Sequence, residues 1–542
     1  MTVDISEWVG RSAADSDNWR TANIMATLGQ IIDNNARYCP DRPAVVYGDL
    51  RWTHAEFAAR VRRLSGGLWQ LGMRHQDRFS VLSMNNSEYL ECYGAAQWAG
   101  FIINTVNFRL ASPEIQWILE DAAPKLLIFE AQYAELIGAL RSRLPGIERY
   151  ICIGDVPQAA AQWAESYDAV LESGQDSGAL IRSDSDDYFC LVYTSGTTGR
   201  PKGVLQSNHS MARCAEIVSS ELCLGSDCRL LASAPLFHAG ASTMSWGAAF
   251  RGGCTVLHRG FDAERVLRTI EAERISAIHL VPTMVHSLLD SPNFGKYDLA
   301  SLRMLLYAAA PMPLPVLRRA VKAFGPITYN GYGQTEINFL TSLHPHQHFL
   351  EGTPQQLKRL ASVGQTHWQC EIRIRTDDGR DCAPNEIGEV VAKSETAMAG
   401  YWNNTVATLA AIRDGWVHTG DLGYLDEQGY LFLVDRKKDM IVSGGENIYS
   451  REVEEAVVQH PAVREVAVIG VPDPKWGEAV HAVVVLTPGS TTDSEALIEF
   501  CRNLIASYKC PKSVSFISAL PRLDTGKVNK VILRRQHAAP AD

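Results

Sequence analysis

A segment rich in glycine and hydroxyl side chains, residues 193–204, constrains this chain more than any other part of its sequence. It follows the apolar run 188–193, which predicts a buried strand. Its glycines let backbone N–H groups approach an anion closely, and its lysine supplies a mobile positive charge suited to phosphate. No Gly-Lys-Ser/Thr sequence follows, and Pro201 with Gly203 argues against a helix starting there, so the spacing is not that of a P-loop.

The segment therefore predicts a turn that binds a polyphosphate. The candidate residues are Thr194, Ser195, Gly196, Thr197, Thr198, Gly199 and Lys202. The alternative is a plain polar hairpin turn, which rarely needs so many hydrogen-bond donors.

Length, charge and cysteine usage limit the class of protein. A chain of 542 residues exceeds a single core and predicts two or more domains. A net charge of −10 argues against a nucleic-acid-binding protein. The cysteines are scattered without a Cys-x-x-Cys pair, and the N-terminus has no basic leader region, so we expect reduced thiols and a cytoplasmic location. The longest apolar stretch, near residues 94–106, is too short to span a bilayer.

Short apolar strands alternate with helical patterns from about residue 22 to residue 434. This alternation predicts βαβ units and mostly parallel sheets. We expect strands over residues 79–84, 125–129 and 150–153 and helices over residues 87–99 and 262–273. The stretch 157–186, rich in Ala, Ser, Asp and Gly, predicts a loop.

The pattern changes after the charged cluster 435–439. Beyond it we expect a helix near 451–459, strands over 463–471 and 479–486, a helix over 493–505 and a last strand near 514–517. These elements make a small α+β unit of roughly one hundred residues, a common domain size. The cluster is therefore the candidate interdomain hinge, although a solvated run of charges is the plainer alternative.

Four later segments carry side chains that suit a nucleotide. Thr335 could donate to a phosphate, and the carboxylate of Glu336 could hold Mg²⁺, which takes carboxylates together with phosphates. Asp421 could accept hydrogen bonds from ribose hydroxyls, and Arg436 could donate beside it. Lys527 follows a Thr-Gly turn. Taken singly, each of these has a plain alternative as a turn residue, a surface ion pair or a solvated lysine.

Histidines occur at two places that suggest chemistry. His238 follows the apolar strand expected over 230–234, where a structural role is the commoner alternative. Three histidines at 344–348 look like metal ligands, but Pro345 and the loop context favour no bound ion.

In this order the segments resemble the adenylate-forming superfamily, in its AMP-forming acyl-CoA synthetase branch. The resemblance covers about residues 28–530 and rests on the Tyr-Thr-Ser-Gly-Thr-Thr-Gly-x-Pro-Lys-Gly motif followed by Tyr-Gly-Gln-Thr-Glu, Thr-Gly-Asp, Asp-Arg-Lys-Lys-Asp, Gly-Gly-Glu-Asn-Ile and Thr-Gly-Lys. It implies an α/β fold. A large N-terminal adenylation domain, residues 1–436, would have mostly parallel sheets with flanking helices, and residues 437–542 would form a smaller, mobile C-terminal α+β domain.

The resemblance also implies a role for each site residue. Residues 194–202 would bind the β- and γ-phosphates of ATP, and Thr335 the α-phosphate. Adenine would lie against Asn330 and Tyr332, with Gly331 and Gly333 in the same ATP-binding segment. Glu336 would bind Mg²⁺, Asp421 and Arg436 would fix the ribose, and Lys527 would bridge the substrate carboxylate and the α-phosphate. Lys438 would be the hinge, and Gly444 and Gly445 would line the path of CoA.

The acyl pocket is expected to be apolar. Its candidate residues are His238, Ala239, Trp246, Ala308, Ala309, Ala310, Gly333 and Ile337. The family often has glycine in the segment 308–310, where this chain has alanines. Amino-acid-activating relatives place an Asp near the position of His238, and an ammonium buried without such a partner is costly. We therefore expect a hydrophobic acid (fatty, alicyclic or aryl), with His238 as a gate of the acyl site or as a structural residue.

Three functions follow from this reading. The first is an AMP-forming carboxylate–CoA ligase that uses ATP, Mg²⁺ and CoA, with domain alternation between adenylation and thioester formation. The second is an adenylating enzyme that loads an acyl carrier protein. The third is a non-catalytic nucleotide-binding protein, which Lys527 disfavours because that lysine is useful only for chemistry. The expected partners are small molecules, without nucleic acid or a membrane span.

Overall fold

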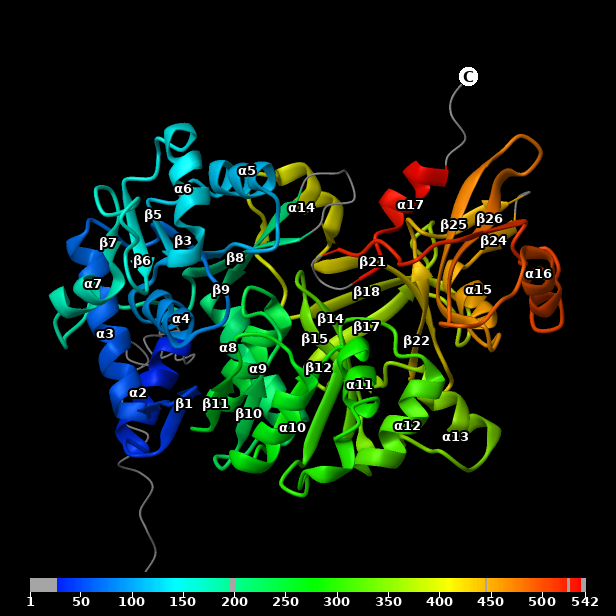
Figure 1. The fold of residues 1–542 in the computed structure, drawn as a ribbon, viewed down its shortest axis with the longest axis horizontal. Coiled ribbons are helices and arrows are strands. Elements are labelled where there is room, and N and C mark those ends of the chain that lie inside the picture. Colours follow the sequence, from blue (N-terminus) through cyan, green and yellow to red (C-terminus); the bar gives the residue numbers. More distant parts are fainter. Residues whose placement is uncertain (1–26, 195–200, 444–445, 524–526, 538–542) are drawn as a thin grey trace, which may run out of the picture.

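The computed structural model describes residues 27–194, 201–443, 446–523 and 527–537. Four sheets run through these residues, and helices cover or separate them (Figure 1). Three sheets lie before residue 437, and the fourth belongs to the C-terminal part of the chain. The fold is thus a large α/β unit followed by a smaller α+β unit, as the sequence predicts.

The first large sheet has eight strands in the order β19-β9-β8-β4-β3-β5-β6-β7. Its strands are β3 (Arg78–Leu82), β4 (Ile102–Thr105), β5 (Leu126–Glu130), β6 (Arg149–Ile153), β7 (Glu165–Ser166), β8 (Tyr188–Thr194), β9 (Lys202–Ser207) and β19 (Gly400–Tyr401). The strands from β8 to β7 pair in parallel, whereas β9 is antiparallel to both β8 and β19. The start of β9 at Lys202 confirms that no helix begins after the glycine-rich segment.

The second large sheet has nine strands in the order β16-β15-β14-β13-β12-β10-β11-β1-β2. They are β1 (Pro43–Tyr47), β2 (Leu50–Thr53), β10 (Arg229–Ala232), β11 (Cys254–Leu257), β12 (Ala277–Leu280), β13 (Met304–Ala308), β14 (Thr328–Gln334), β15 (Asn338–Leu343) and β16 (Gln365–Thr366). The central pairs, from β1 to β14, are parallel. Their carboxyl ends therefore share one edge, where open α/β sheets commonly bind ligands.

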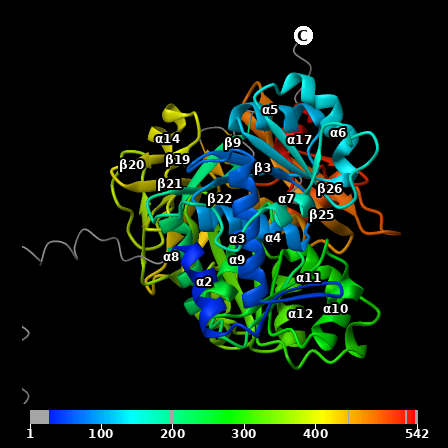
Figure 2. The ribbon, with the colours of Figure 1, turned by 90° about the vertical axis from the view of Figure 1, so that its left-hand side faces the viewer.

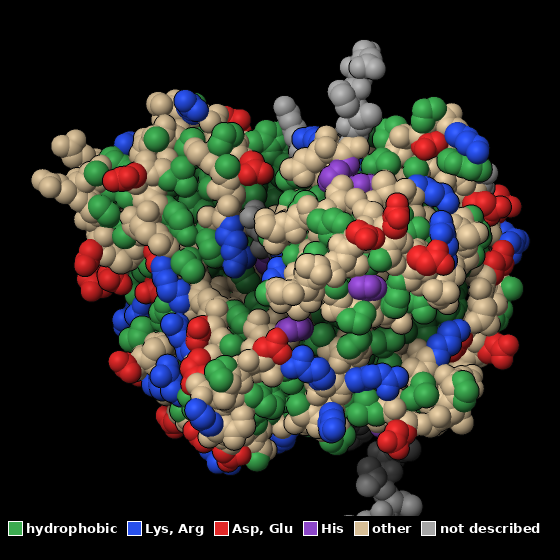
Figure 3. Space-filling model, turned by 45° about the vertical axis from the view of Figure 1, so that its right-hand side comes forward, with side chains coloured by type: hydrophobic (Ala, Val, Ile, Leu, Met, Phe, Trp, Pro, Cys, Tyr) green, Lys and Arg blue, Asp and Glu red, His purple; other side chains and the backbone are tan. Residues whose placement is uncertain are grey.

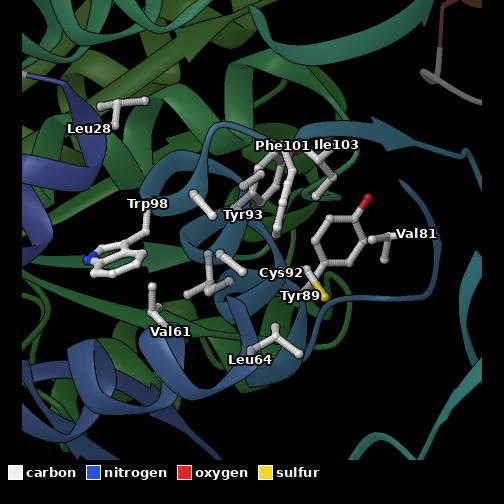
Figure 4. Packing of buried hydrophobic residues seen from close by; sticks show 14 of the residues in the cluster. Leu28, Val61, Leu64, Val81, Tyr89, Cys92, Tyr93, Trp98, Phe101 and Ile103 are labelled. Carbon is white, nitrogen blue, oxygen red and sulfur yellow. The ribbon is translucent and has the colours of Figure 1, made fainter. Parts of the chain in front are cut away.

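Helices fill the space between these two sheets. They are α2 (Leu28–Tyr38), α3 (His54–Gln70), α4 (Ser87–Ala99), α8 (Asn208–Glu221) and α9 (Ala239–Ala249). Figure 2 shows α2 and α3 on the side that faces the viewer. The largest apolar cluster joins Val45 of one sheet to Val81 and Ile103 of the other through Tyr89 and Tyr93 of α4 (Figure 4). Because α4 is buried around nearly its whole circumference, it needs no polar face.

Further helices cover the outer faces: α5 (Ser112–Ala122), α6 (Ala134–Leu140), α10 (Ala263–Ala272), α11 (Pro282–Leu289) and α12 (Leu314–Phe324). The helix α7 (Tyr167–Ser173) packs against α3 instead, and its apolar residues join the cluster between the two sheets. The helix expected over 262–273 is α10, which Asp262 caps by accepting a hydrogen bond from the Arg265 N–H at 2.7 Å. The loop expected over 157–186 is wrong in part. It contains β7 and α7, because Tyr167, Val170 and Leu171 find an apolar partner surface that short-range composition does not reveal.

A third sheet, between residues 370 and 436, is antiparallel. It contains β17 (Cys370–Arg375), β18 (Gly388–Ser394), β20 (Ile412–Arg413), β21 (Trp416–Leu425) and β22 (Leu431–Arg436), with α13 (Pro354–Lys358) and α14 (Thr405–Ala411) nearby in the sequence. The alternation that predicts parallel sheets does not extend to this region. Here a short turn joins β21 to β22, and a loop over residues 376–387 joins β17 to β18. Neither connection contains a crossover helix of the kind that parallel strands need, and both pairs are antiparallel.

The C-terminal sheet contains β23 (Ile441–Ser443), β24 (Glu446–Ile448), β25 (Val463–Asp473), β26 (Gly477–Leu486) and β27 (Ser513–Phe516). The helices α15 (Ser450–Val457) and α16 (Ser494–Arg502) match the two expected ones, whereas α17 (Lys530–His537) was not expected. Among the described residues, every helix is too short or too polar to traverse a bilayer. Acidic and basic side chains are interspersed over the face shown in Figure 3.

Candidate active site

A tight hairpin between β14 and β15 presents the Thr-Glu pair. At Gly333 the strands come so close that a Cβ atom would lie 1.5 Å from the Asn338 carbonyl oxygen, so only glycine fits. The pairing shifts register at this point, and Asn338 adopts a φ of 31° on the other side of the turn. The turn carries Thr335 and Glu336 beyond the carboxyl end of the parallel strands.

Asp421 on β21 is the centre of a buried hydrogen-bond network. It accepts from the Tyr332 hydroxyl at 2.7 Å and from the Gln334 side-chain amide at 2.5 Å. Across the strand pair it faces Arg436 of β22, whose Nε lies 2.6 Å from its second oxygen. The Asp421 side chain is 9% exposed and that of Arg436 is 41% exposed. The carboxylate is thus fixed from three directions, with the guanidinium at the solvent side.

A second carboxylate, that of Glu336, is held by an aromatic residue from β19. The Tyr401 hydroxyl donates to Glu336 Oε1 at 2.9 Å. Burial, with Glu336 nearby, raises the pKa of Tyr401, so its hydroxyl remains a donor at neutral pH. The ammonium of Lys202 lies 4.9 Å from the centre of the Tyr401 ring. This contact joins the end of the glycine-rich segment to the Thr-Glu turn.

Lys527 reaches this site from the C-terminal unit. Lys527 precedes α17, which Figure 1 shows in red beside the C-terminal sheet. Burial lowers the pKa of the Lys527 ammonium, and the positive charge of Arg436 lowers it further. The charges of Asp421, Glu336 and Lys438 also act on this pKa. Solvent still reaches the side chain. A lysine from the far end of the sequence therefore lies close enough to the two carboxylates for their charges to act on it.

Polar contacts hold the C-terminal unit in this position. Arg451 of α15 donates to the Leu433 carbonyl of β22 at 3.0 Å, and the backbone N–H of Ser450 donates to Asp435. Within the C-terminal segment itself, Arg534 of α17 pairs with Asp439 at 2.8 Å. The contacts of Arg451 and Ser450 with β22 are thus polar.

His238 is the first residue before α9, on a loop that two buried side chains fasten. Asn85 bonds the Ala234 carbonyl and the Leu236 N–H at 2.9 and 2.8 Å, and the Tyr93 hydroxyl bonds the Leu236 carbonyl at 2.8 Å. Burial lowers the pKa of His238 to about 3, with contributions from Arg109 and Lys527. The imidazole is therefore neutral at pH 7 and lies near enough to Lys527 to sense its charge.

The predicted acyl-pocket residues are not all brought to one open surface. Trp246 is buried in the core, edge-on to Tyr93 with ring centres 5.2 Å apart. Ile337 is fully buried in the apolar cluster of the third sheet. Both therefore contribute packing in this structure. Ala308 ends β13 beside Gly331 of β14, and Ala309 follows it with an exposed methyl group.

Ala309 has a φ of 71°, in the left-handed region that costs a non-glycine residue about 1 kcal/mol. We therefore expect Ala309→Gly to leave the protein equally stable or up to about 1 kcal/mol more stable, because relief of strain exceeds or balances the added freedom of the unfolded chain. Thermal unfolding followed by circular dichroism checks this. Ala308→Gly, at an ordinary strand position, is the control and should lower the melting temperature. An equal decrease in melting temperature in both variants would show that Ala309 is not strained.

The remaining predicted residues differ in what the structure shows of them. Thr194 and Lys202 face each other across β8 and β9. Asn330 donates to the Ser362 carbonyl at 3.2 Å. The predicted phosphate-binding residues 195–199 and the CoA-path residues 444–445 lie outside the described residues. In the histidine-rich segment, His348 contacts the Tyr307 hydroxyl at 3.0 Å, and no cluster of metal-ligating side chains occurs in the described part of the chain.

Two site residues escaped the sequence reasoning. Gln334 binds Asp421, and its place within the Tyr-Gly-Gln-Thr-Glu motif was a usable signal. Tyr401 binds Glu336 from 65 residues away, through the pairing of β19 with β9. No local pattern links a Gly-Tyr pair near residue 400 to the Thr-Glu turn.

Comparison with known proteins agrees with this geometry. The profile described as AMP-binding enzyme matches residues 32–402, and the profile of the AMP-binding enzyme C-terminal domain matches residues 452–527. The chain belongs to the AMP-binding enzyme family. Within this family it is an AMP-forming acyl-CoA synthetase, because curated ligases of that kind match nearly its whole length.

Among these relatives is a feruloyl-CoA synthase of Amycolatopsis, 37% identical over 94% of this chain and 99% of its own length. A long-chain-fatty-acid–CoA ligase of Mycobacterium tuberculosis is 34% identical over 95% of this chain and 99% of its own length. Among solved structures, the o-succinylbenzoate CoA synthetase of Bacillus subtilis with its acyl-adenylate intermediate superimposes with a TM-score of 0.81. It is 31% identical and covers 93% of this chain and 97% of its own.

Proposed function

We propose that this synthetase activates a hydrophobic carboxylic acid (fatty, alicyclic or aryl) with ATP and passes the acyl group to CoA. The observation that carries the proposal is the position of Lys527, which comes from the C-terminal unit and lies close enough to Asp421 and Glu336 for their charges to act on its ammonium. A cation from one unit and two carboxylates from the other suit a reaction that joins an anionic acid to an anionic nucleotide. A binding protein would have no use for the added lysine.

In this proposal the hydrogen-bond network orients the nucleotide. Asp421 would accept from the ribose hydroxyls with Arg436 beside it, and Lys202 with Thr194 would hold the phosphates at the end of β8 and β9. Asn330 and Tyr332 would border adenine. Glu336 offers a carboxylate next to the phosphate site, an oxygen ligand of the kind that Mg²⁺ takes. These residues fit the ion, which when bound would offset phosphate charge.

The chemistry follows from this arrangement. A carboxylate oxygen of the acid attacks the α-phosphorus, the bond from that phosphorus to the bridging oxygen breaks, and pyrophosphate leaves. Lys527 and the Thr335 hydroxyl would stabilise the charge on the α-phosphate and the acid. A thiol then attacks the acyl carbon, AMP leaves with the bonding electrons, and the thiol proton passes to solvent. A thiol of pKa about 8.5 is sufficiently ionised for this step.

The choice of acid rests on the surroundings of His238. The imidazole is neutral and the residues beside it on α9, from Ala239 to Met244, are small or apolar, so nothing there would balance a substrate ammonium. The relatives named for feruloyl and long-chain fatty acids support a hydrophobic acid here. Their different names leave the chain length or ring open.

We further propose that the C-terminal unit swings about Lys438 between the two half-reactions. The Arg436 carbonyl accepts from the Asp439 N–H at 2.8 Å, so Lys438 sits within a tight turn between the units. With the domain boundary proposed between residues 436 and 437, this turn would lie at the start of the C-terminal domain. Gly444 and Gly445 would then border the CoA path.

Lys438→Pro should keep acyl-adenylate formation within about fivefold of wild type and slow thioester formation at least tenfold, because proline fixes φ and restricts the residue before it. Lys438→Ala, which removes the charge but does not restrict the backbone, is the control. Both steps should proceed at nearly the wild-type rate in this variant. Pyrophosphate release and CoA-thioester yield measure the two steps separately. A loss of adenylation with thioester formation intact would reject the hinge.

The whole proposal is tested by mass spectrometry of products after incubation with ATP, Mg²⁺, CoA and a panel of acids. A CoA thioester is the expected product. Acyl-adenylate without thioester would indicate a carrier-protein acceptor instead. Neither product with any acid, although ATP binds, would indicate a nucleotide-binding protein without this chemistry.

A further inference from the structure

A small cavity lies behind the loop that carries His238. It has a volume of about 10 Å³, room for one water-sized group. Its lining consists of Leu230, Leu231, Ala232, Ala234, Ala241, Met244 and His279. His279 is thus the one ionisable side chain among these lining residues, and it lies near the carboxyl end of β12, next to the end of β10.

Both ring nitrogens of His279 lack a hydrogen-bond partner within the described part of the chain. The residue is only 8% exposed. Buried polar atoms in folded proteins are almost always paired, so two unpaired nitrogens on one side chain need an explanation. Burial also lowers the pKa of His279 to about 4, so the ring is neutral at pH 7, with one N–H donor and one acceptor nitrogen.

The cavity adjoins the proposed acyl site. His279 borders the first turn of α9, because a Cβ atom at Gly240 would come within 3.3 Å of its Cε1. His238 immediately precedes this helix. Met244 and Leu230 of the cavity belong to the same apolar cluster that Ala308 packs against. A substrate acyl group that enters past His238 and Ala308 would therefore approach His279.

We propose that His279 hydrogen-bonds a hydroxyl group on the acyl part of the substrate, and that the enzyme therefore prefers hydroxylated acids, aryl or aliphatic, to their unsubstituted counterparts. This inference rests on the proposed ligase function. A hydroxyl both donates and accepts, so it can pair with a neutral imidazole. It is also the size of the water that the cavity admits, whereas a carboxylate is larger and charged.

The test compares matched acids that differ by one hydroxyl group. The pairs are cinnamic with para-hydroxycinnamic acid, cinnamic with meta-hydroxycinnamic acid, and octanoic with ω-hydroxyoctanoic acid. The kcat/KM for pyrophosphate release is measured for each acid with the full-length enzyme. At least one hydroxylated acid should exceed its partner about tenfold or more in kcat/KM, because without the hydroxyl group the ring nitrogen that faces the cavity stays buried and unpaired.

His279→Leu should bring this ratio to within about twofold of one, while the unsubstituted acid changes less than about threefold. His279→Gln, which keeps a donor and an acceptor, should retain part of the ratio. His258→Leu is the matched control, because His258 is also buried with a pKa lowered to about 4 but bonds Thr269 and does not line the cavity. Its ratio should equal that of wild type.

Ratios near one for every pair in the wild type would overturn the inference, since a trapped water would then satisfy His279. A ratio that survives in His279→Leu would overturn it too. If the His279→Leu variant does not fold, the inference is tested by the kcat/KM ratios of the wild type and of the His279→Gln variant. A lack of pyrophosphate release with every acid would reject the ligase proposal itself, and this inference with it.

Discussion

Replacing Lys527 with alanine should slow acyl-adenylate formation by about a hundredfold to a thousandfold, the usual effect of losing one charge-stabilising donor. Thioester formation from preformed acyl-adenylate should change less than about fivefold. The reason is position, because the Lys527 ammonium lies close enough to Asp421 and Glu336 for their charges to act on it, beside the proposed place of the α-phosphate. Pyrophosphate release and single-turnover thioester formation measure the two steps.

The control is Lys512→Ala, which removes an exposed lysine of the same unit that donates to the Ser507 carbonyl. Both steps should continue at the wild-type rate in this variant. If Lys527→Ala slows both steps equally, the lysine serves both reactions and alternation between two positions is not needed. If Lys527→Ala slows neither step, the acid does not meet ATP beside Lys527, Asp421 and Glu336.

Asp421→Ala should lower kcat/KM for ATP by about a hundredfold and the free energy of unfolding by about 2 kcal/mol. The variant removes the acceptor of Tyr332 and Gln334 and the partner of Arg436. The loss of stability is moderate, because solvent reaches the guanidinium and screens the pair. Initial rates at varied ATP and chemical denaturation give the two quantities.

Asp381→Ala is the matched control on the same sheet. Asp381 also pairs with arginines, at 3.2 Å from both Arg373 and Arg375, but its side chain is 53% exposed. We expect its removal to change stability by less than about 1 kcal/mol and to leave the kinetics with ATP unchanged. An unaltered kcat/KM for ATP in Asp421→Ala would exclude the ribose role.

The sequence predicts elements well where one local signal dominates. The helix over 87–99 has the expected bounds, because Asn86 supplies an N-cap and Gly100 a left-handed end. Prediction from the sequence fails where tertiary contacts determine whether a helix forms. The helix α7 lies in a stretch whose composition indicates a loop, and the short helix α17 was not expected. Such short helices depend on packing more than on propensity.

The residues of the candidate site likewise fall into those that the sequence predicts and those that it does not. Asp421, Glu336 and Lys527 stand out as motif residues, and the structure brings them together. Their partners do not stand out, because Tyr401 reaches Glu336 only through a two-stranded pairing between distant segments. Apolar pocket residues are the hardest to predict. Trp246 and Ile337 are apolar residues near the motifs, yet they pack in cores, whereas His279 on a buried strand lines a cavity.

The most direct measurement is acid-dependent exchange of labelled pyrophosphate into ATP, made without CoA across a panel of hydrophobic acids. Reversible adenylation assisted by Lys527 predicts rapid exchange with at least one acid, and loss of this exchange in the Lys527→Ala variant. Thioester production by an enzyme that shows no such exchange would contradict the account, because the acid would then reach CoA without passing through AMP.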